Sequence, residues 1–286
     1  MTTSDVQYET LRFERAVARD ETGDIGEIGW LHLNRPDKLN SFTIKMWREM
    51  AALGRELVND PTLRALVVVG EGRAFSSGID TTVFTGNAES DLAEVEGPTT
   101  HSDPTVQAIL RTQHAYSWLE NAAYPTIAGV HGYALGAGLQ LALACDHRVF
   151  AKGTQVGLLE HRYGILPDLG GTQRLPRVVG AGKAKELIWT AARIDAAEAF
   201  RIGLCERLVE PDALLPEVTA LANTIAAQPP LAVRGAKRAV AASGVLPVAE
   251  GLVVEAEAQS VCLRSEDMRE AIGAFVEKRR PQYHAR

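Results

Sequence analysis

A glycine-rich turn that runs into an almost wholly apolar helix constrains this chain more than any other feature. The sequence GYALGAGLQLALACD covers residues 132–146 and follows a short apolar strand predicted at 126–130. A helix that is apolar on nearly every side must be buried. Its first N–H groups lack intrahelical partners, the helix dipole makes their surroundings positive, and the small turn residues let a ligand approach them. The pattern therefore favours a site that binds an oxyanion.

Taken alone, this motif also fits a purely structural turn. A dinucleotide-binding turn fits poorly, because Gly136 and Gly138 lack the third glycine of that fingerprint. A second turn, AFSSGID at 74–80, follows the apolar strand predicted at 65–69 and favours a functional role. Two such junctions of strand and turn can each direct one N–H donor at the same carbonyl oxygen.

Further motifs accompany the two turns: NRPDKLNSF at 34–42, Glu160, PDLGGTQRLPRVVG at 167–180 and SEDMREAIGAFVEKRRP at 265–281. Their order resembles that of the crotonase superfamily, the enoyl-CoA hydratase/isomerase family. The resemblance extends over most of the chain from about Leu31. It implies an α/β fold, a crotonase-like spiral of ββα units with a C-terminal helical oligomerisation region. The spiral core with the oxyanion hole and the acyl-CoA site is expected at 1–209, and helices for trimer packing and CoA contact at 210–286.

The resemblance also implies an oxyanion hole for a thioester carbonyl, made by the backbone N–H groups of Ser76 and Ala137. Family members usually carry glycine at the second position. Alanine forms helices well and its methyl group does not block a backbone donor, so we expect the donor to be retained. Loss of one such donor typically costs about 10²- to 10³-fold in rate, which makes the hole a large expected contribution to catalysis.

A set of residues in these motifs is expected to contact CoA. As in the family, basic side chains from the NRP motif and from the end of the last helix would meet its phosphates. For the helix end, a solvated cluster that complements the helix dipole is the alternative. The expected contacts are Arg35, Lys38, Ala74, Ser76, Ile79, Asp80, Phe275 and Lys278. Coenzyme A is part of the substrate, and no separate cofactor is expected.

The acidic residues favour isomerisation over hydration. Hydratases of the family carry one glutamate where this chain has Gln140 and another where it has Glu160. A neutral amide can orient a water molecule but cannot take its proton, so efficient hydration is not expected. Asp168 stands where dienoyl-CoA isomerases and ring-opening isomerases carry an aspartate. We therefore predict an enzyme that shifts a C=C bond through a dienolate, with Glu160 and Asp168 as acid/base groups and Gln140 beside them.

Each of these residues also has a structural alternative. Gln140 can bond a backbone group in the core. Glu160 can pair with Arg162 or His161 at the surface, and Asp168 can cap the helix that follows it. Two other functions stay open: a hydratase with Gln140 in place of the first glutamate, and an acyl-CoA binding protein without catalysis.

Composition limits the partners of the chain. At 286 residues with 46% hydrophobic content, it can form one main domain with a helical extension. The net charge of −6 at pH 7 argues against a nucleic-acid binder. No apolar run is long enough to cross a membrane, no signal-peptide pattern begins the chain, and its histidines and cysteines lack metal-ligand spacing. We expect a cytoplasmic protein, without membrane or metal partners, that forms a homotrimer or a dimer of trimers as its family does.

Hydrophobic periodicity and turn residues predict the remaining elements. Between 84 and 105 the sequence is polar and acidic, so we expect a mobile loop, which in the family borders the acyl pocket. Strands are expected at 6–17, 25–33, 65–69 and 126–130, and helices at 43–58, 106–121, 212–227, 231–242, 248–263 and 268–278.

Overall fold

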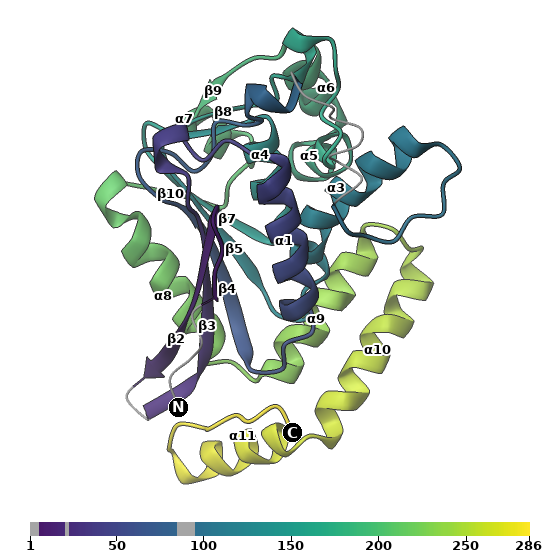
Figure 1. Cartoon of the computed structure of the whole chain (residues 1–286). Helices are drawn as coiled ribbons and strands as arrows, with labels where there is room; N and C mark the ends of the chain where they lie inside the picture. Colours follow the sequence, from purple (N-terminus) through teal and green to yellow (C-terminus); the bar gives the residue numbers. More distant parts are fainter. Residues whose placement is uncertain (1–5, 21–22, 85–94) are drawn as a thin grey trace.

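The computed structural model describes residues 6–20, 23–84 and 95–286, which form two sheets and the helices around them (Figure 1). The main sheet has seven strands in the order β1-β2-β3-β4-β5-β7-β10, and a smaller sheet has the order β6-β8-β9. The predicted α/β class is confirmed. The strands are β1 Val6–Gln7, β2 Leu11–Asp20, β3 Gly23–Leu33, β4 Leu63–Gly70, β5 Thr126–Val130, β6 Tyr133–Leu135, β7 His147–Ala151, β8 Gln155–Gly157, β9 Ile194–Asp195 and β10 Arg207–Val209.

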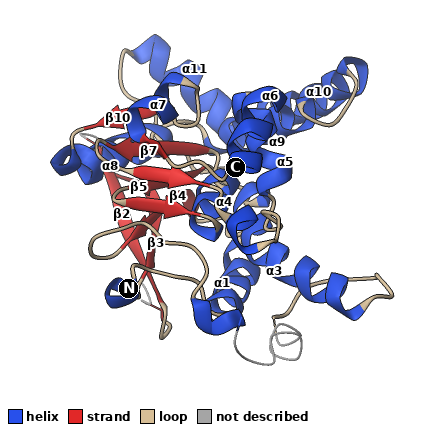
Figure 2. Cartoon of the chain, turned by 90° about the horizontal axis from the view of Figure 1, so that it is seen from above, coloured by secondary structure: helices blue, strands red, loops and turns tan. Residues whose placement is uncertain are grey.

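Helices cover both faces of the main sheet and continue beyond it at the C-terminal end (Figure 2). The helices predicted from periodicity are confirmed, with ends close to the expected residues. Within the described part of the chain, no helix is both long enough and apolar enough to span a membrane. The α-helices are α1 Ile44–Leu57, α3 Pro104–Asn121, α4 Ala137–Ala144, α5 Gly171–Val179, α6 Ala181–Thr190, α7 Ala196–Arg201, α8 Leu214–Ala226, α9 Pro230–Ser243, α10 Val248–Arg264 and α11 Glu266–Glu277, and the 3-10 helices are η1 Pro36–Lys38, η2 Thr81–Phe84, η3 Glu160–Tyr163 and η4 Pro211–Ala213.

The central strand β4 is buried on both faces, because consecutive side chains of a strand point to opposite sides of the sheet. Leu66 and Val68 lie in the larger apolar core with side chains of α1, α3 and α4. Val67 and Val69 lie in a smaller core under α8. From β3 to β10 the neighbouring strands of this sheet are parallel. Their carboxyl ends therefore share one edge, where the turns after β4, β5 and β7 begin.

Two segments differ from the expectations. The first expected strand is interrupted after Gln7, so β1 and β2 replace it. The loop expected at 84–105 ends before α3, which begins at Pro104 with Asp103 as its N-cap residue. Residues 85–94 of that loop lie outside the described residues.

The C-terminal part divides differently from the boundary expected at residue 209. Helix α8 belongs to the core, since it packs on the main sheet, whereas α9, α10 and α11 form the extension. Lys237 connects α9 to the core, because its ammonium group forms an ion pair of 2.7 Å with Asp146. The same ammonium group donates to the carbonyls of Leu119 at 3.1 Å and Tyr124 at 2.9 Å.

The contact between α1 and α3 offers a test of how tightly the core is packed. A Cβ atom on Gly54 would lie 2.5 Å from the Trp118 ring, so we expect Gly54→Ala to destabilise the protein by about 1–3 kcal/mol despite the good helix propensity of alanine. Gly251→Ala in α10 is the matched control, because its Cβ would meet no neighbouring group within 4 Å. The free energy of unfolding of the control should increase by up to about 1 kcal/mol. Urea unfolding at one protein concentration measures both, and equal stability of the two variants would show that Trp118 moves aside without cost.

Candidate active site

Three segments of the chain meet at one cavity because the short strands before them pair in register. Ser76 forms a parallel bridge with Ala134 of β6, and Ala134 pairs with Val156 of β8. Because Ser76, Ala134 and Val156 are paired across these strands, the residues that come after them in the chain leave the small sheet next to one another. All three segments contribute to the lining of the cavity.

The cavity has a volume of about 120 Å³ and mixes apolar walls with a few polar groups. This composition is typical of a small-molecule site. Over the residues that the structure describes, no group of three His, Cys, Asp or Glu side chains is arranged to hold a metal ion. The cavity is lined by Ser77, Gly78, Ile79, Thr81, Phe84, Leu135, Gly136, Ala137, Leu159, Glu160, Tyr163, Ile165 and Arg193.

The backbone amide of Ser76 is already bonded within the protein, so the prediction that it is a free oxyanion donor is wrong. Ser76 is fully buried. Its N–H donates to the Tyr133 carbonyl at 2.8 Å, and its own carbonyl accepts from the Leu135 N–H at 3.0 Å. The bridge to β6 thus uses both backbone groups. The AFSSGID motif does not reveal how far this pairing extends, and the donor predicted from it therefore lies three residues before the free amide.

The free donors at the two turns are the N–H groups of Ile79 and Ala137. The Phe42 N–H donates to the Gly78 carbonyl at 2.7 Å, and the Asp80 N–H donates to the Phe42 carbonyl at 2.8 Å. Between these two bonds, the Ile79 N–H points to the opposite side. The Ala137 N–H is the first of α4 and has no intrahelical partner. Within the described residues, neither amide donates to a protein acceptor.

Glycine is required where the two turns approach each other. Gly78 has a φ of 107°, and a Cβ atom there would lie 2.9 Å from the Leu135 oxygen and 3.9 Å from the Ala137 nitrogen. Gly136, just before α4, has a φ of 50°. The two free amides therefore belong to adjacent stretches of backbone, an arrangement that suits two donors to one oxygen atom.

Among the described residues that line the cavity, Glu160 is the acidic one. It is 4% exposed, and burial raises the pKa of its carboxyl to about 7, with a smaller rise from Asp168 and an opposing hydrogen bond from Gln140. Its Oε2 atom is buried and has no hydrogen-bond partner in the described part of the chain. The surface pairing with Arg162 or His161 is wrong, because the carboxyl faces inward and bonds Gln140.

Asp168 is half-buried in the turn before α5 and is not part of the cavity lining. Burial raises the pKa of its carboxyl, against the effect of a hydrogen bond from its own backbone N–H. Its carbonyl accepts from the Gln113 side chain of α3 at 2.6 Å, which holds the turn in place. The capping alternative is wrong, since Gly170 is the N-cap residue of α5, and within the described residues the Asp168 side chain accepts no hydrogen bond from the first turn of this helix. Charge on Asp168 nevertheless raises the pKa of Glu160, so the two carboxyl groups interact.

Gln140 connects the two acidic segments. This fully buried side chain donates from Nε2 to Glu160 Oε1 at 2.7 Å. Its Oε1 accepts from the backbone N–H of Gly171 at 2.9 Å. The structural alternative, a bond to a core backbone group, is therefore present, and the same side chain also bonds the candidate acid.

The residues expected to contact CoA are spread over several environments. Ile79 lines the cavity, whereas Ala74 is fully buried, with its carbonyl accepting from the Asn40 side chain at 2.8 Å. Arg35 and Asp80 form an ion pair of 3.0 Å and are partly buried. Direct contact of their charges with a ligand would require this pair to open.

Other expected CoA contacts lie at the surface. Lys38 is exposed at the end of η1. Phe275 is 84% exposed on α11, and Lys278 follows the same helix. In Figure 1, α11 lies at the opposite end of the molecule from α4 and α5, and within one chain neither Phe275 nor Lys278 lines the cavity.

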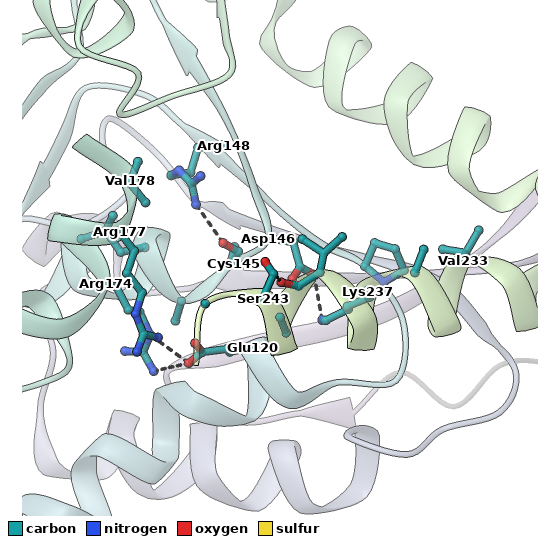
Figure 3. A pocket seen from close by; sticks show the side chains of 17 residues that line it. Glu120, Cys145, Asp146, Arg148, Arg174, Arg177, Val178, Val233, Lys237 and Ser243 are labelled. Atoms are coloured by element: carbon teal, nitrogen blue, oxygen red, sulfur yellow. Dashed lines mark hydrogen bonds and ion pairs between the residues drawn. The ribbon is translucent and has the colours of Figure 1, made fainter. Parts of the chain in front are cut away.

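A larger cavity, of about 590 Å³, lies between α5 and α9 and contains none of the predicted site residues (Figure 3). Charged side chains in its wall are paired: Lys237 with Asp146 at 2.7 Å, and Arg174 with Glu120 at 2.8 Å. The first pair joins α9 of the extension to the core, and the second joins α5 to α3 within the core. We therefore assign the smaller cavity, which contains Glu160, as the candidate active site.

Comparison with known proteins shows what this chain resembles. Residues 25–286 match the family model described as enoyl-CoA hydratase/isomerase. A probable enoyl-CoA hydratase from Mycobacterium bovis is 37% identical over 278 residues, which cover 96% of this chain and 98% of that protein. A crotonyl-CoA hydratase from Syntrophomonas wolfei is 36% identical over 254 residues, which cover 88% of this chain and 93% of that protein.

A solved structure agrees with these sequence relatives. A Thermobifida fusca protein, described as an enoyl-CoA hydratase in complex with acetoacetyl-CoA, matches with a TM-score of 0.73 and 35% identity. The match covers 87% of this chain and 94% of that chain. The crotonase-type fold expected from the motifs is confirmed.

The raised pKa of Glu160 predicts a pH-dependent stability. A carboxyl whose pKa rises from 4.5 to about 7 on folding stabilises the fold fully below pH 4.5, and this contribution is lost as the pH rises through about 7. Glu160→Gln removes the titration, so its stability relative to the parent chain should increase by about 2 kcal/mol between pH ~5 and pH ~8. Chemical denaturation at both pH values measures this difference. Exposed Glu250→Gln is the control, and the same pH response in both variants would contradict the burial of a charge at Glu160.

Proposed function

The chain belongs to the enoyl-CoA hydratase/isomerase family of the crotonase superfamily, and we propose that it shifts a C=C bond along the acyl chain of an enoyl- or dienoyl-CoA. The observation that carries the proposal is the buried carboxyl of Glu160 in a cavity that is also lined by Ile79 and Ala137, whose amides are free. The complex of the Thermobifida fusca relative with acetoacetyl-CoA supports a CoA thioester as the ligand.

The proposed reaction moves one proton within the substrate. Glu160 takes a proton from the carbon between the thioester carbonyl and the C=C bond, and the electron pair moves toward the carbonyl oxygen. The resulting dienolate oxygen accepts hydrogen bonds from the N–H groups of Ile79 and Ala137. A proton returned to the carbon at the far end of the dienolate leaves the C=C bond conjugated with the carbonyl. The proton lost is replaced by the proton gained, so the reaction consumes neither water nor a redox cofactor.

Asp168 is the proposed second acid/base group. Burial raises the pKa of Asp168, and its charge interacts with Glu160, and both observations support this role, since perturbed carboxyl groups that interact are typical of acid/base sites. A dienoyl substrate needs proton transfer at two well-separated carbons. Two carboxyl groups on different segments suit that requirement better than one.

Hydration is the second candidate function, because the relatives from Mycobacterium bovis and Syntrophomonas wolfei are named as hydratases. Both ends of the Gln140 amide are already bonded, to Glu160 and to Gly171. An amide cannot take a proton from water. A hydratase built on this site would rely on Glu160 to activate the water molecule, and this difference is why isomerisation is the first candidate.

We propose that the CoA part of the substrate runs along the surface near η1. Exposed Lys38 would then meet a phosphate, while the ion pair between Arg35 and Asp80 holds the backbone beside Ile79 in place. Phe275 and Lys278 lie away from the cavity within one chain. Their proposed contact with CoA is therefore made from a neighbouring copy.

The helical extension is the proposed interface of a homotrimer or a dimer of trimers. Large apolar side chains are exposed along α9, α10, α11 and the segment between the first two. Exposed apolar patches of this kind mark sites of protein association. The exposed residues are Val240, Val245, Leu246, Val248, Leu252, Val253, Val261, Leu263, Met268, Ile272, Phe275 and Val276.

This interface predicts that the protein is an oligomer that a charge on α10 disrupts. Light scattering should give the mass of a trimer or hexamer for the parent chain. Val253→Glu, at a side chain that is 58% exposed, should shift the population to smaller species because it would bury a charge. Val17→Glu is the control, because Val17 is 46% exposed on β2, outside the extension, and this variant should have the mass of the parent chain. A monomeric parent chain would contradict the assembly, and an unchanged mass for Val253→Glu would exclude this face.

The acid/base assignment predicts large losses of isomerase activity. Glu160→Gln and Asp168→Asn should each slow double-bond migration by roughly 10²- to 10⁴-fold, while the affinity for a CoA thioester stays nearly unchanged. Absorbance of the conjugated product measures turnover of a 3-enoyl-CoA, and calorimetry measures affinity. Full turnover in Asp168→Asn would remove Asp168 from the mechanism. Fast hydration of crotonyl-CoA by the parent chain, without isomerisation, would establish the second candidate instead.

A further inference from the structure

We infer that Gln140 is a positioning residue that fixes the Glu160 carboxyl so that Oε2 is the oxygen left to carry the transferred proton. This inference rests on the proposed proton transfer at Glu160. It adds which atom takes part and which contacts hold that atom in place.

The orientation of the Gln140 amide follows from the chemistry of its neighbours. The backbone N–H of Gly171 can only donate, so the Gln140 atom that it meets at 2.9 Å must be the amide oxygen. The NH₂ group then faces Glu160 and donates to Oε1 at 2.7 Å. An NH₂ group has no acceptor capacity. Oε1 therefore serves as an acceptor in both protonation states of Glu160, and a proton on this carboxyl must reside on Oε2.

The backbone around Glu160 reinforces this asymmetry. A Cβ atom on Gly136 would lie 3.1 Å from Oε1, so this oxygen is packed against the turn that precedes α4. The buried Oε2 has no hydrogen-bond partner within the described residues. A buried acceptor without a partner is costly for stability and is typical of a functional group kept free for a ligand. The two oxygens of one carboxyl thus have different roles.

Gln140 also fixes the distance between the two acidic segments. Gly171 is the first residue of α5 and follows Asp168 in the same turn. A Cβ atom on Gly171 would lie 3.0 Å from the Gln140 oxygen, so glycine is needed for this close approach. Since the N–H lies at the positive end of α5, it polarises the amide and strengthens its bond to Glu160. One side chain therefore connects the Glu160 carboxyl to the start of the helix that follows Asp168.

The charges around Glu160 predict the direction in which its pKa changes when Gln140 is replaced. Charge on Asp168 raises this pKa, and the hydrogen bond from Gln140 lowers it. Burial raises the pKa of Tyr116 well above its usual range, so the phenol stays neutral. Loss of the Gln140 bond should therefore raise the Glu160 pKa. The titratable and charged groups near the carboxyl are Asp168, Tyr116, Tyr163, Arg193, His161 and Arg162.

Three variants separate positioning from charge. Gln140→Met keeps a similar length and loses both hydrogen bonds. Gln140→Glu keeps an acceptor for Gly171, loses the donor to Glu160 and adds a like charge. Gln173→Met on α5 is the matched control, since this exposed amide donates to its neighbour Thr172 at 3.2 Å and bonds no other side chain in the described part of the structure.

The kinetic experiment measures isomerisation of a 3-enoyl-CoA between about pH 5 and about pH 9. In the parent chain kcat/KM should rise with pH as Glu160 loses its proton. In Gln140→Met we expect kcat to fall about 10²-fold with KM nearly unchanged, since a misplaced catalytic group costs this much. In Gln140→Met, the midpoint of the kcat/KM profile should move to a higher pH than in the parent chain. In Gln140→Glu it should move to a still higher pH. Gln173→Met should match the parent chain.

A second measurement needs no activity and keeps the inference testable if the proposed function fails. Glu160→Gln is introduced into the parent chain and into each Gln140 variant, and the resulting change in the free energy of unfolding is measured as a function of pH. This dependence reports the pKa of Glu160 in the substrate-free protein. An upward shift of this pKa in Gln140→Met supports the positioning role, even if the parent chain proves to be a hydratase. An unchanged pKa together with an unchanged kcat in Gln140→Met would overturn it.

Discussion

The pairing of Ser76 with β6, and of β6 with β8, determines where chemistry can take place in this protein. Each bond in this short ladder uses a backbone N–H and a backbone carbonyl, so the register cannot slip without breaking buried hydrogen bonds. A slip of one residue would turn the Ile79 N–H away from the Ala137 turn and present a side chain instead. The ladder therefore explains how two amides and one carboxyl, from three separate segments, meet at one cavity.

Local signals in the sequence were sufficient for the helices and strands of the fold, and of the predicted site residues Ile79, Ala137 and Glu160 line the cavity. The caps Thr43, Asp103 and Ser265 and the glycines of the turns mark helix ends and sharp bends, which depend on neighbours in the chain. Choosing Ile79 rather than Ser76 as the free donor depended on where a strand pairing stops. That point is set by contacts with β6, which lies far away in the sequence.

Long-range packing also explains the other differences. Helix α8 has the periodicity of any amphipathic helix, and the sequence does not show that its partner is the main sheet. Asp168 stands at the position that the resemblance marks, yet the structure shows that it interacts with Glu160 without lining the cavity. The contacts of Phe275 and Lys278 depend on how copies of the chain assemble, which a single sequence does not encode directly.

An amide at residue 140 is consistent with the proposed role of Glu160 as a base near neutral pH. Burial is the largest cause that raises the Glu160 pKa to about 7, where the charged and neutral forms are both populated. A second carboxyl at residue 140 would raise it further and leave less of the basic form, whereas the Gln140 NH₂ group stabilises that form. The proposed second acid, Asp168, interacts with Glu160 through its charge from another segment. In the proposed mechanism, an amide in place of a carboxyl at this one position thus suits proton removal from carbon by a single, well-oriented oxygen better than the shared activation of water.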